Sequence, residues 1–117
     1  VEYRRKTMKK VGIIRCQQTE DMCPGTVDFK FSALGKGAFA ETGPGEIVGF
    51  VSCGGCPGKR VLQRVKMMIE RGASVIAFAS CMKNGNPIGF ACPHFQQIEK
   101  SVKDNVSDEI KVLDWTH

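Results

Sequence analysis

Short, almost wholly apolar runs recur along the chain, and they constrain its fold more than any other feature. Residues 74–81 (S-V-I-A-F-A-S-C) are apolar at nearly every position, and residues 10–16 (K-V-G-I-I-R-C) and 46–53 (E-I-V-G-F-V-S-C) are of the same kind. Such runs are typical of parallel strands that are covered on both faces. A fourth run, residues 109–115 (E-I-K-V-L-D-W), alternates in polarity and predicts an edge strand with one wetter face.

Helical patterns separate these runs. Residues 59–71 place Leu62, Val65 and Ile69 on one face, and Gly72 then supplies the left-handed residue that commonly ends a helix. Two further stripes follow Pro24 and Pro93, and they consist of Val27, Phe31 and Leu34 and of Phe95, Ile98 and Val102. Alternating strands and helices predict an α/β fold, a three-layer sandwich around a four-stranded, mostly parallel sheet with the flavodoxin-like order 2-1-3-4.

The charge distribution bears on domain organisation and on partners. Met8 followed by K-K-V-G-I-I looks like a natural start, so we expect residues 1–7 to be a tag remnant or an extension and residues 8–117 to form one domain. The net charge is +5, but residues 1–10 carry five basic side chains against one acidic, which leaves only +1 for the rest. A solvated basic tail explains this pattern, and the isolated aromatic residues offer no platform on which bases could stack. We therefore expect no nucleic-acid partner.

Hydropathy and cysteine usage indicate the compartment and the chemistry. No apolar run approaches the roughly 20 residues that a membrane span needs, and the polar start V-E-Y-R-R-K-T does not resemble a signal peptide. We expect a cytoplasmic protein with no membrane partner. In a reducing cytosol, the six cysteines of this chain are more typical of metal binding or catalysis than of a disulfide framework.

The cysteines follow the predicted strand and helix pattern. Three of them, Cys16, Cys53 and Cys81, each close a predicted strand, and a histidine, His117, follows the fourth. The other three are each followed by proline, a residue favoured at the first position of a helix, and they are Cys23, Cys56 and Cys92. Strand ends and helix starts meet at the carboxyl edge of a parallel sheet, where open α/β sheets bind ligands. These side chains are therefore expected to gather at that edge.

The number and kind of these side chains indicate a metal. Tetrahedral zinc takes four ligands from Cys and His, and iron–sulfur clusters are usually held by four thiolates. The pair Cys53-Gly-Gly-Cys56 has the usual spacing of two ligands, and His94, expected in the first turn of a helix, is a further ligand or a proton donor. The candidate metal ligands are Cys16, Cys23, Cys53, Cys56, Cys81, Cys92, His94 and His117. Eight exceed the need of one mononuclear site, which suggests two metals, a cluster, or metal beside free redox thiols.

Other interpretations of the same residues stay open. Cys53 and Cys56 could form the dithiol of a thiol-disulfide oxidoreductase, since C-x-x-C between a strand and a helix occurs in such enzymes. A phosphate-binding loop is a weaker interpretation, because Lys59 stands where cysteine phosphatases carry an arginine, and lysine lacks the bidentate contact. Each cysteine alone could also be a small buried hydrophobic residue. No catalytic residue is identified, and whether the chain is an enzyme stays open.

In combination, these motifs resemble the CGGC-domain family. The resemblance rests on R-C-x6-C-P-G near the start, C-G-G-C-P-G-K after an apolar strand, A-S-C in the third strand, C-P-H, and the terminal T-H. The family comprises small prokaryotic proteins described as metal-binding, with zinc suggested from their cysteines and histidines. The resemblance, which covers residues 8–117, implies that the eight candidates are metal ligands for Zn²⁺ or an iron–sulfur cluster. A role in redox or electron transfer, with a redox protein as partner, would follow from a cluster.

Overall fold

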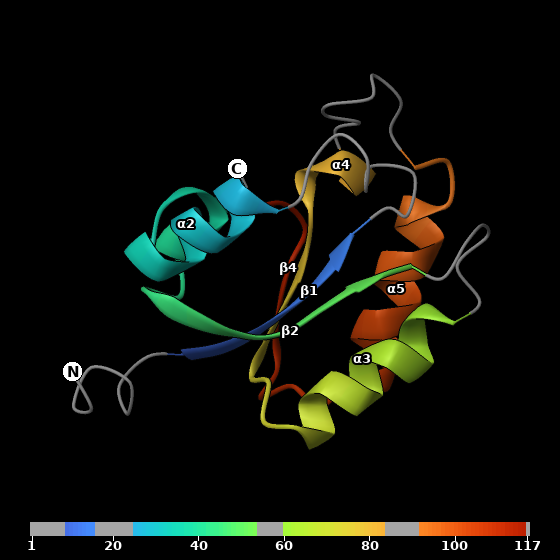
Figure 1. The fold of residues 1–117 in the computed structure, drawn as a ribbon. Helices are drawn as coiled ribbons and strands as arrows, with labels where there is room; N and C mark the ends of the chain where they lie inside the picture. Colours follow the sequence, from blue (N-terminus) through green and yellow to red (C-terminus); the bar gives the residue numbers. More distant parts are fainter. Residues whose placement is uncertain (1–8, 16–24, 54–59, 84–91, 117) are drawn as a thin grey trace.

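The computed structural model describes residues 9–15, 25–53, 60–83 and 92–116. Its four strands are β1 (Lys9–Arg15), β2 (Gly45–Ser52), β3 (Val75–Phe78) and β4 (Lys111–Leu113). All neighbouring strands run parallel, in the order β2-β1-β3-β4 (Figure 1). The predicted α/β class, the parallel sheet and its strand order are thus confirmed.

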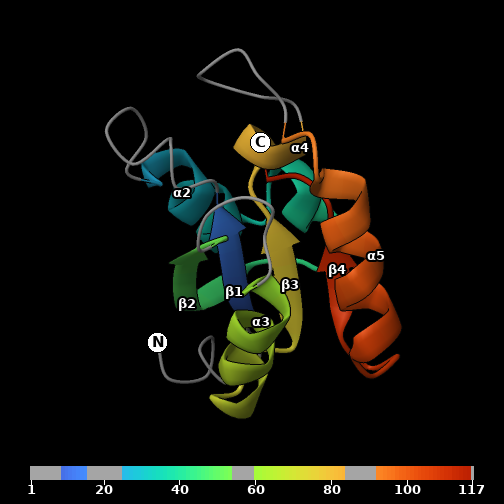
Figure 2. The same cartoon turned by 90° about the vertical axis from the view of Figure 1, so that its right-hand side faces the viewer.

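Within the described residues, three longer helices cover the sheet. They are α2 (Thr26–Leu34), α3 (Val61–Glu70) and α5 (Phe95–Asn105), and two short ones are the 3₁₀ helix η2 (Gly37–Ala40) and α4 (Ser80–Lys83). Helix α2 lies on one face, and α3 and α5 lie on the other (Figures 1 and 2). The connection from β1 to β2 runs opposite in direction to that from β2 to β3, so right-handed crossovers place α2 and α3 on opposite faces. The result is the predicted three-layer sandwich.

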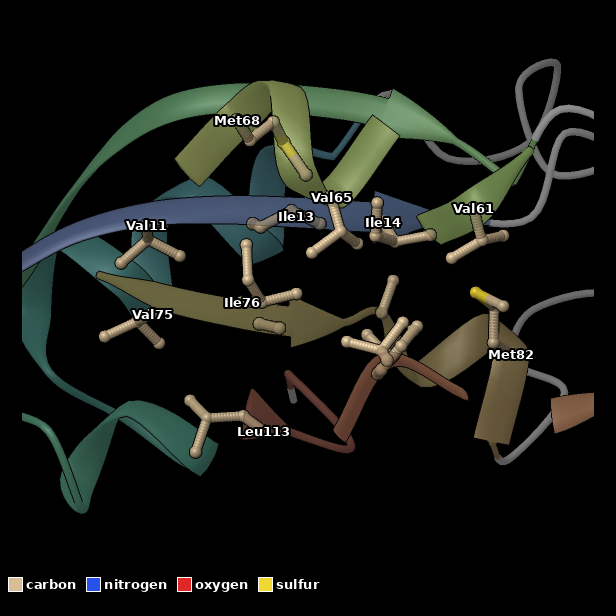
Figure 3. Close-up of a cluster of buried hydrophobic side chains, with 14 of the residues drawn as sticks. Val11, Ile13, Ile14, Val61, Val65, Met68, Val75, Ile76, Met82 and Leu113 are labelled. Carbon is tan, nitrogen blue, oxygen red and sulfur yellow. The ribbon is translucent and has the colours of Figure 1, made fainter. Parts of the chain in front are cut away.

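The core lies on both sides of the two central strands. Ile13, Ile14 and Ile76 (Figure 3) are fully buried, and so is Phe78, as expected for strands that are covered on both faces. The burial of these side chains supplies the main driving force for folding, at roughly 1.5–3 kcal/mol for each large apolar side chain. The apolar runs of the sequence therefore become the centre of the sheet.

Two glycines allow α3 to approach the sheet closely. A Cβ atom at Gly12 would lie 2.8 Å from Sδ of Met68, and one at Gly49 would lie 2.7 Å from the same sulfur atom. Val48, between Ile47 and Gly49, is an extra residue in β2 that bulges out of register with β1. The bulge brings Gly49 opposite Gly12, so that the Met68 side chain, itself buried, fits over both.

The third strand is shorter than predicted. It ends at Phe78, and the last residues of the 74–81 run enter α4. The N–H of Ala79 makes the last hydrogen bond from this segment to β1, at 2.8 Å from the carbonyl oxygen of Ile14. The N–H of Ser80 donates to the Thr116 side chain instead, so the hydrogen-bond ladder between β1 and β3 ends here. The prediction that Cys81 closes a strand was therefore wrong, since this residue lies within α4.

Further predicted boundaries also differ from the structure. The fourth strand covers only Lys111–Leu113 of the predicted 109–115. The helices also begin later than the prolines that follow the cysteines in the sequence. Helices α2, α3 and α5 start at Thr26, Val61 and Phe95. In α5, Pro93 precedes the N-cap residue, so it is not the first helical residue as predicted. In the described parts of the chain, no helix combines the length and the apolar character that crossing a membrane requires.

Candidate metal centre

The ends of β1 and β2 lie side by side at the carboxyl edge of the sheet. Cys53 follows β2 directly, and its N–H donates to the carbonyl oxygen of Arg15, the last residue of β1, at 2.8 Å. This bond extends the parallel ladder one residue beyond the strand. The backbone of Cys53 is therefore held beside the residue that directly precedes Cys16 in the sequence.

A second contact joins the segment after β3 to the start of α5. The N–H of Cys92 donates to the carbonyl oxygen of Met82 at 2.8 Å, and Met82 directly follows Cys81 in α4. The Met82 side chain is fully buried, so it fixes α4 against the end of the core (Figure 3). Cys92 and the backbone of α4 are thus neighbours at the same edge as Cys53.

A third contact brings the carboxyl-terminal segment to α4. The N–H of Ser80 donates to Oγ1 of Thr116 at 3.2 Å, and the N–H of Thr116 donates to Oγ of Ser80 at 3.1 Å. The two hydroxyl oxygens lie 3.4 Å apart, and both residues are almost fully buried. We call this reciprocal arrangement the Ser80–Thr116 clamp. It joins the residue before Cys81 to the residue before His117.

The clamp gives a test of how firmly this edge is held. Replacing Thr116 with valine keeps the shape but leaves the buried N–H of Ser80 without its acceptor. We expect a loss of about 1–3 kcal/mol in the free energy of unfolding, measured by urea denaturation. Ser74→Ala is the matched control, because the Ser74 hydroxyl is exposed and bonds only at 3.5 Å, and it should change stability little. Equal effects of the two substitutions would contradict a buried clamp.

The described candidate ligands differ in burial. Cys53 is a free thiol with an exposed fraction of 5% and belongs to the hydrophobic core, whereas Cys92 is partly exposed and packs against that core. His94 is partly exposed and is the N-cap of α5, one position before the first turn in which it was predicted. The N–H of Phe95 donates to the carbonyl oxygen of Cys92 at 3.2 Å, which turns the chain into α5.

Two cations that the cysteine and histidine pattern did not indicate also lie at this edge. Arg15 is 8% exposed, and its guanidinium carbon lies 5.2 Å from the centre of the Phe50 ring. Arg64 of α3 donates to the carbonyl oxygen of Ser52 at 3.1 Å and to its hydroxyl at 3.2 Å. Arg15 directly precedes Cys16 in the sequence, and Arg64 contacts the residue that precedes Cys53, so both cations would offset the negative charge of a thiolate site. The sequence signal for Arg15 was its place between an apolar run and Cys16.

The donor chemistry of the described residues fits a soft or borderline metal. Two sulfur donors and an imidazole lie in segments that border the carboxyl edge, and Cys and His are the ligands that zinc and iron–sulfur clusters take. Within the described ranges, no three Cys, His, Asp or Glu side chains are grouped closely enough to hold an ion. Four of the predicted ligands, namely Cys16, Cys23, Cys56 and His117, lie outside the described residues.

Comparisons with known proteins agree with the resemblance seen in the motifs. The sequence model of the CGGC domain matches residues 10–117. An uncharacterized protein of Methanocaldococcus jannaschii is 36% identical over 116 residues, which cover 92% of this chain and 86% of the relative. A second uncharacterized protein of that organism is 33% identical over 54 residues, covering 45% of this chain and 77% of the relative. No solved structure matches the chain.

Proposed function

The chain belongs to the CGGC domain family, and from this premise we propose that it is a metal-binding protein whose site is the carboxyl edge of its sheet. The cysteine and histidine side chains of that edge would hold Zn²⁺ or an iron–sulfur cluster. The function is binding and, with a cluster, electron transfer to a redox protein partner.

One observation carries this proposal, namely that three contacts join segments that bear candidate ligands. Cys53 is hydrogen-bonded to the residue before Cys16, Cys92 to the residue after Cys81, and the Ser80–Thr116 clamp joins the neighbours of Cys81 and His117. The first and the third of these contacts join residues that are far apart in the sequence. All three contacts lie at the carboxyl edge of the sheet, and this arrangement supports a shared site.

The donor set bears on the identity of the metal. A mixture of thiolate and imidazole is usual for zinc, whereas an excess of cysteine suits a cluster. We propose zinc, because His94 caps the helix that follows Cys92 and so stands within two residues of a candidate thiolate. Bound zinc would supply a tetrahedral cross-link between segments and would carry no redox change of its own.

The burial of Cys53 bears on the oxidoreductase alternative. Thiol-disulfide exchange requires a thiolate that can reach the sulfur of a partner, so catalytic cysteines are at least partly exposed. Cys53 has an exposed fraction of 5%, which suits a ligand that faces inward better than a nucleophile that attacks a substrate. This observation favours metal binding over exchange.

The experiment that tests the proposal is elemental analysis of tag-free protein purified without oxygen, paired with an absorbance spectrum. We expect at least one equivalent of metal per chain. A colourless protein with zinc would support the zinc site, and broad visible absorbance with iron and sulfide would support the cluster. A protein that carries less than about a tenth of an equivalent, and that does not retain added Zn²⁺ after gel filtration, would refute the proposal, since structural zinc sites bind very tightly.

A further inference from the structure

The peptide group that links Ser52 to Cys53 is hydrogen-bonded at both of its polar atoms, to two different elements of the fold. Its N–H, which belongs to Cys53, donates to the carbonyl oxygen of Arg15 at the end of β1, at 2.8 Å. Its carbonyl oxygen, which belongs to Ser52, accepts a hydrogen bond from Nη1 of Arg64 in α3, at 3.1 Å. Because the N–H and C=O of a planar trans peptide group point in opposite directions, the backbone that leads into Cys53 is held from both sides.

The bond from Arg64 lies on the open side of the sheet. In the described sheet β2 is an edge strand with β1 as its neighbour, and the Ser52 carbonyl oxygen points away from β1. Water can satisfy a carbonyl group at an open edge, so this contact is not needed to avoid an unsatisfied polar group. Nη1 of Arg64 also lies 3.2 Å from the Ser52 hydroxyl oxygen, so one nitrogen atom contacts two oxygen atoms of the same residue. The contact therefore fixes the position of Ser52 relative to α3.

Arg64 is itself well placed to hold another segment. It lies in α3 between Val61 and Val65, whose side chains face the sheet and are buried (Figure 3). Its N–H donates to the carbonyl oxygen of Arg60 at 3.1 Å, in the first turn of the helix. The start of α3 is thus packed against the core, and the partly exposed Arg64 side chain reaches from this helix to the end of β2.

Cys53 is the candidate ligand whose position depends on this contact. Its side chain is 5% exposed and belongs to the core, so small movements of its backbone would move the sulfur atom. Metal–ligand bond lengths vary by only about 0.2 Å, and outer groups that orient ligands typically contribute about 10- to 100-fold to metal affinity.

We propose that Arg64 is a positioning residue for the Cys53 thiol, and that its bond to Ser52 strengthens metal binding at the carboxyl edge. This inference rests on the proposed function, because it assigns a residue that tunes the proposed site.

The positive charge of Arg64 is a second effect that has to be separated from its hydrogen bond. A cation near a thiolate site favours the thiolates whether or not it is bonded to the backbone. Lys66 follows Arg64 by two residues in α3, carries the same charge and lines the same groove beside Val51 of β2. Its side chain is exposed. Lys66→Leu therefore removes a charge from this flank of α3 while the Arg64–Ser52 contact stays in place, which makes it the matched control.

Competition for Zn²⁺ between the full chain and a chromophoric chelator, in the presence of a reductant, measures the affinity. Arg64→Leu removes the donor, and we expect it to raise the dissociation constant for Zn²⁺ about tenfold or more, with the same amount of Zn²⁺ bound at saturation. Arg64→Lys should recover most of this loss, because lysine also donates from a positively charged nitrogen. Lys66→Leu should leave the dissociation constant unchanged.

Urea denaturation of the metal-free variants separates positioning from stability. A merely structural role predicts that Arg64→Leu lowers the free energy of unfolding but binds Zn²⁺ as tightly as the original chain, and this result would overturn the inference. An equal loss of affinity in Lys66→Leu would also overturn it, because charge alone would then explain the effect. Circular dichroism checks folding, and Arg64→Gln, whose side chain is shorter and neutral, replaces Arg64→Leu if the latter does not fold.

The same measurements distinguish failure of this inference from failure of the proposed function. If the original chain neither carries metal nor binds added Zn²⁺, the proposed function is wrong and the inference fails with it. If the original chain binds Zn²⁺ and the Arg64 variants bind it equally tightly, only the inference is wrong.

Discussion

Replacing Cys53 with serine is expected to lower the metal bound per chain several-fold. Serine carries oxygen in place of the larger sulfur, and its hydroxyl does not ionise at neutral pH, whereas zinc and iron–sulfur clusters bind thiolates. Cys53 stands where β2 ends, beside the end of β1, and the chain continues from it through Gly54 and Gly55 to Cys56. Cys56→Ser is expected to have a similar effect.

Metal content is measured by elemental analysis after anaerobic purification, with circular dichroism to establish that each variant is folded. Ser52→Ala is the matched control, because it changes the adjacent residue without removing a thiol, and Arg64 keeps its bond to the Ser52 carbonyl oxygen. This control should carry as much metal as the original chain. If both cysteine variants also do, the pair Cys53 and Cys56 is not part of the site.

Replacing Phe78 with alanine should destabilise the protein by about 3–5 kcal/mol, the usual cost of truncating a buried phenylalanine. Phe78 is fully buried at the end of β3, and its ring packs edge-to-face against Phe95 with the ring centres 5.4 Å apart. Phe95 is the first residue of α5, directly after His94. The substitution therefore leaves a cavity between the end of the central strand and the helix start that follows Cys92.

Phe29→Ala is the control for this substitution. Phe29 also makes an edge-to-face pair, with Phe50 at 5.1 Å, but 44% of it is exposed. We expect its truncation to cost about 1 kcal/mol, since little surface is buried and mainly the ring pair is lost. Urea denaturation of the two variants measures the difference. Equal losses of stability would show that Phe78 does not anchor the helix start.

The sheet could be predicted from the sequence because its central strands are buried on both faces. Ile13 and Ile14 are adjacent in the chain and both inaccessible to solvent, which is why the run reads as continuously apolar. The predicted order 2-1-3-4 is that of flavodoxin-like folds, which share this alternation of strands and helices. These are local patterns and general rules, and both act over short stretches of the chain.

The details of the carboxyl edge could not be predicted because they depend on contacts between distant residues. The run 74–81 does not reveal that Ser80 leaves the strand, since its hydrogen-bond partner, Thr116, lies 36 residues away. Arg64 likewise reaches Ser52 across 12 residues. The cysteine pattern indicated a common edge, but the distances between sulfur atoms depend on loops whose conformation no local pattern determines.

The central claim is that cysteine sulfur at the carboxyl edge of the sheet binds a metal. X-ray absorption spectroscopy of the bound metal tests this claim most directly. For zinc, the account predicts a shell of sulfur atoms at about 2.3 Å, with any imidazole nitrogen at about 2.0–2.1 Å. A cluster would give a sulfur shell around iron. A metal surrounded only by nitrogen and oxygen would contradict the account, because no cysteine would then be a ligand.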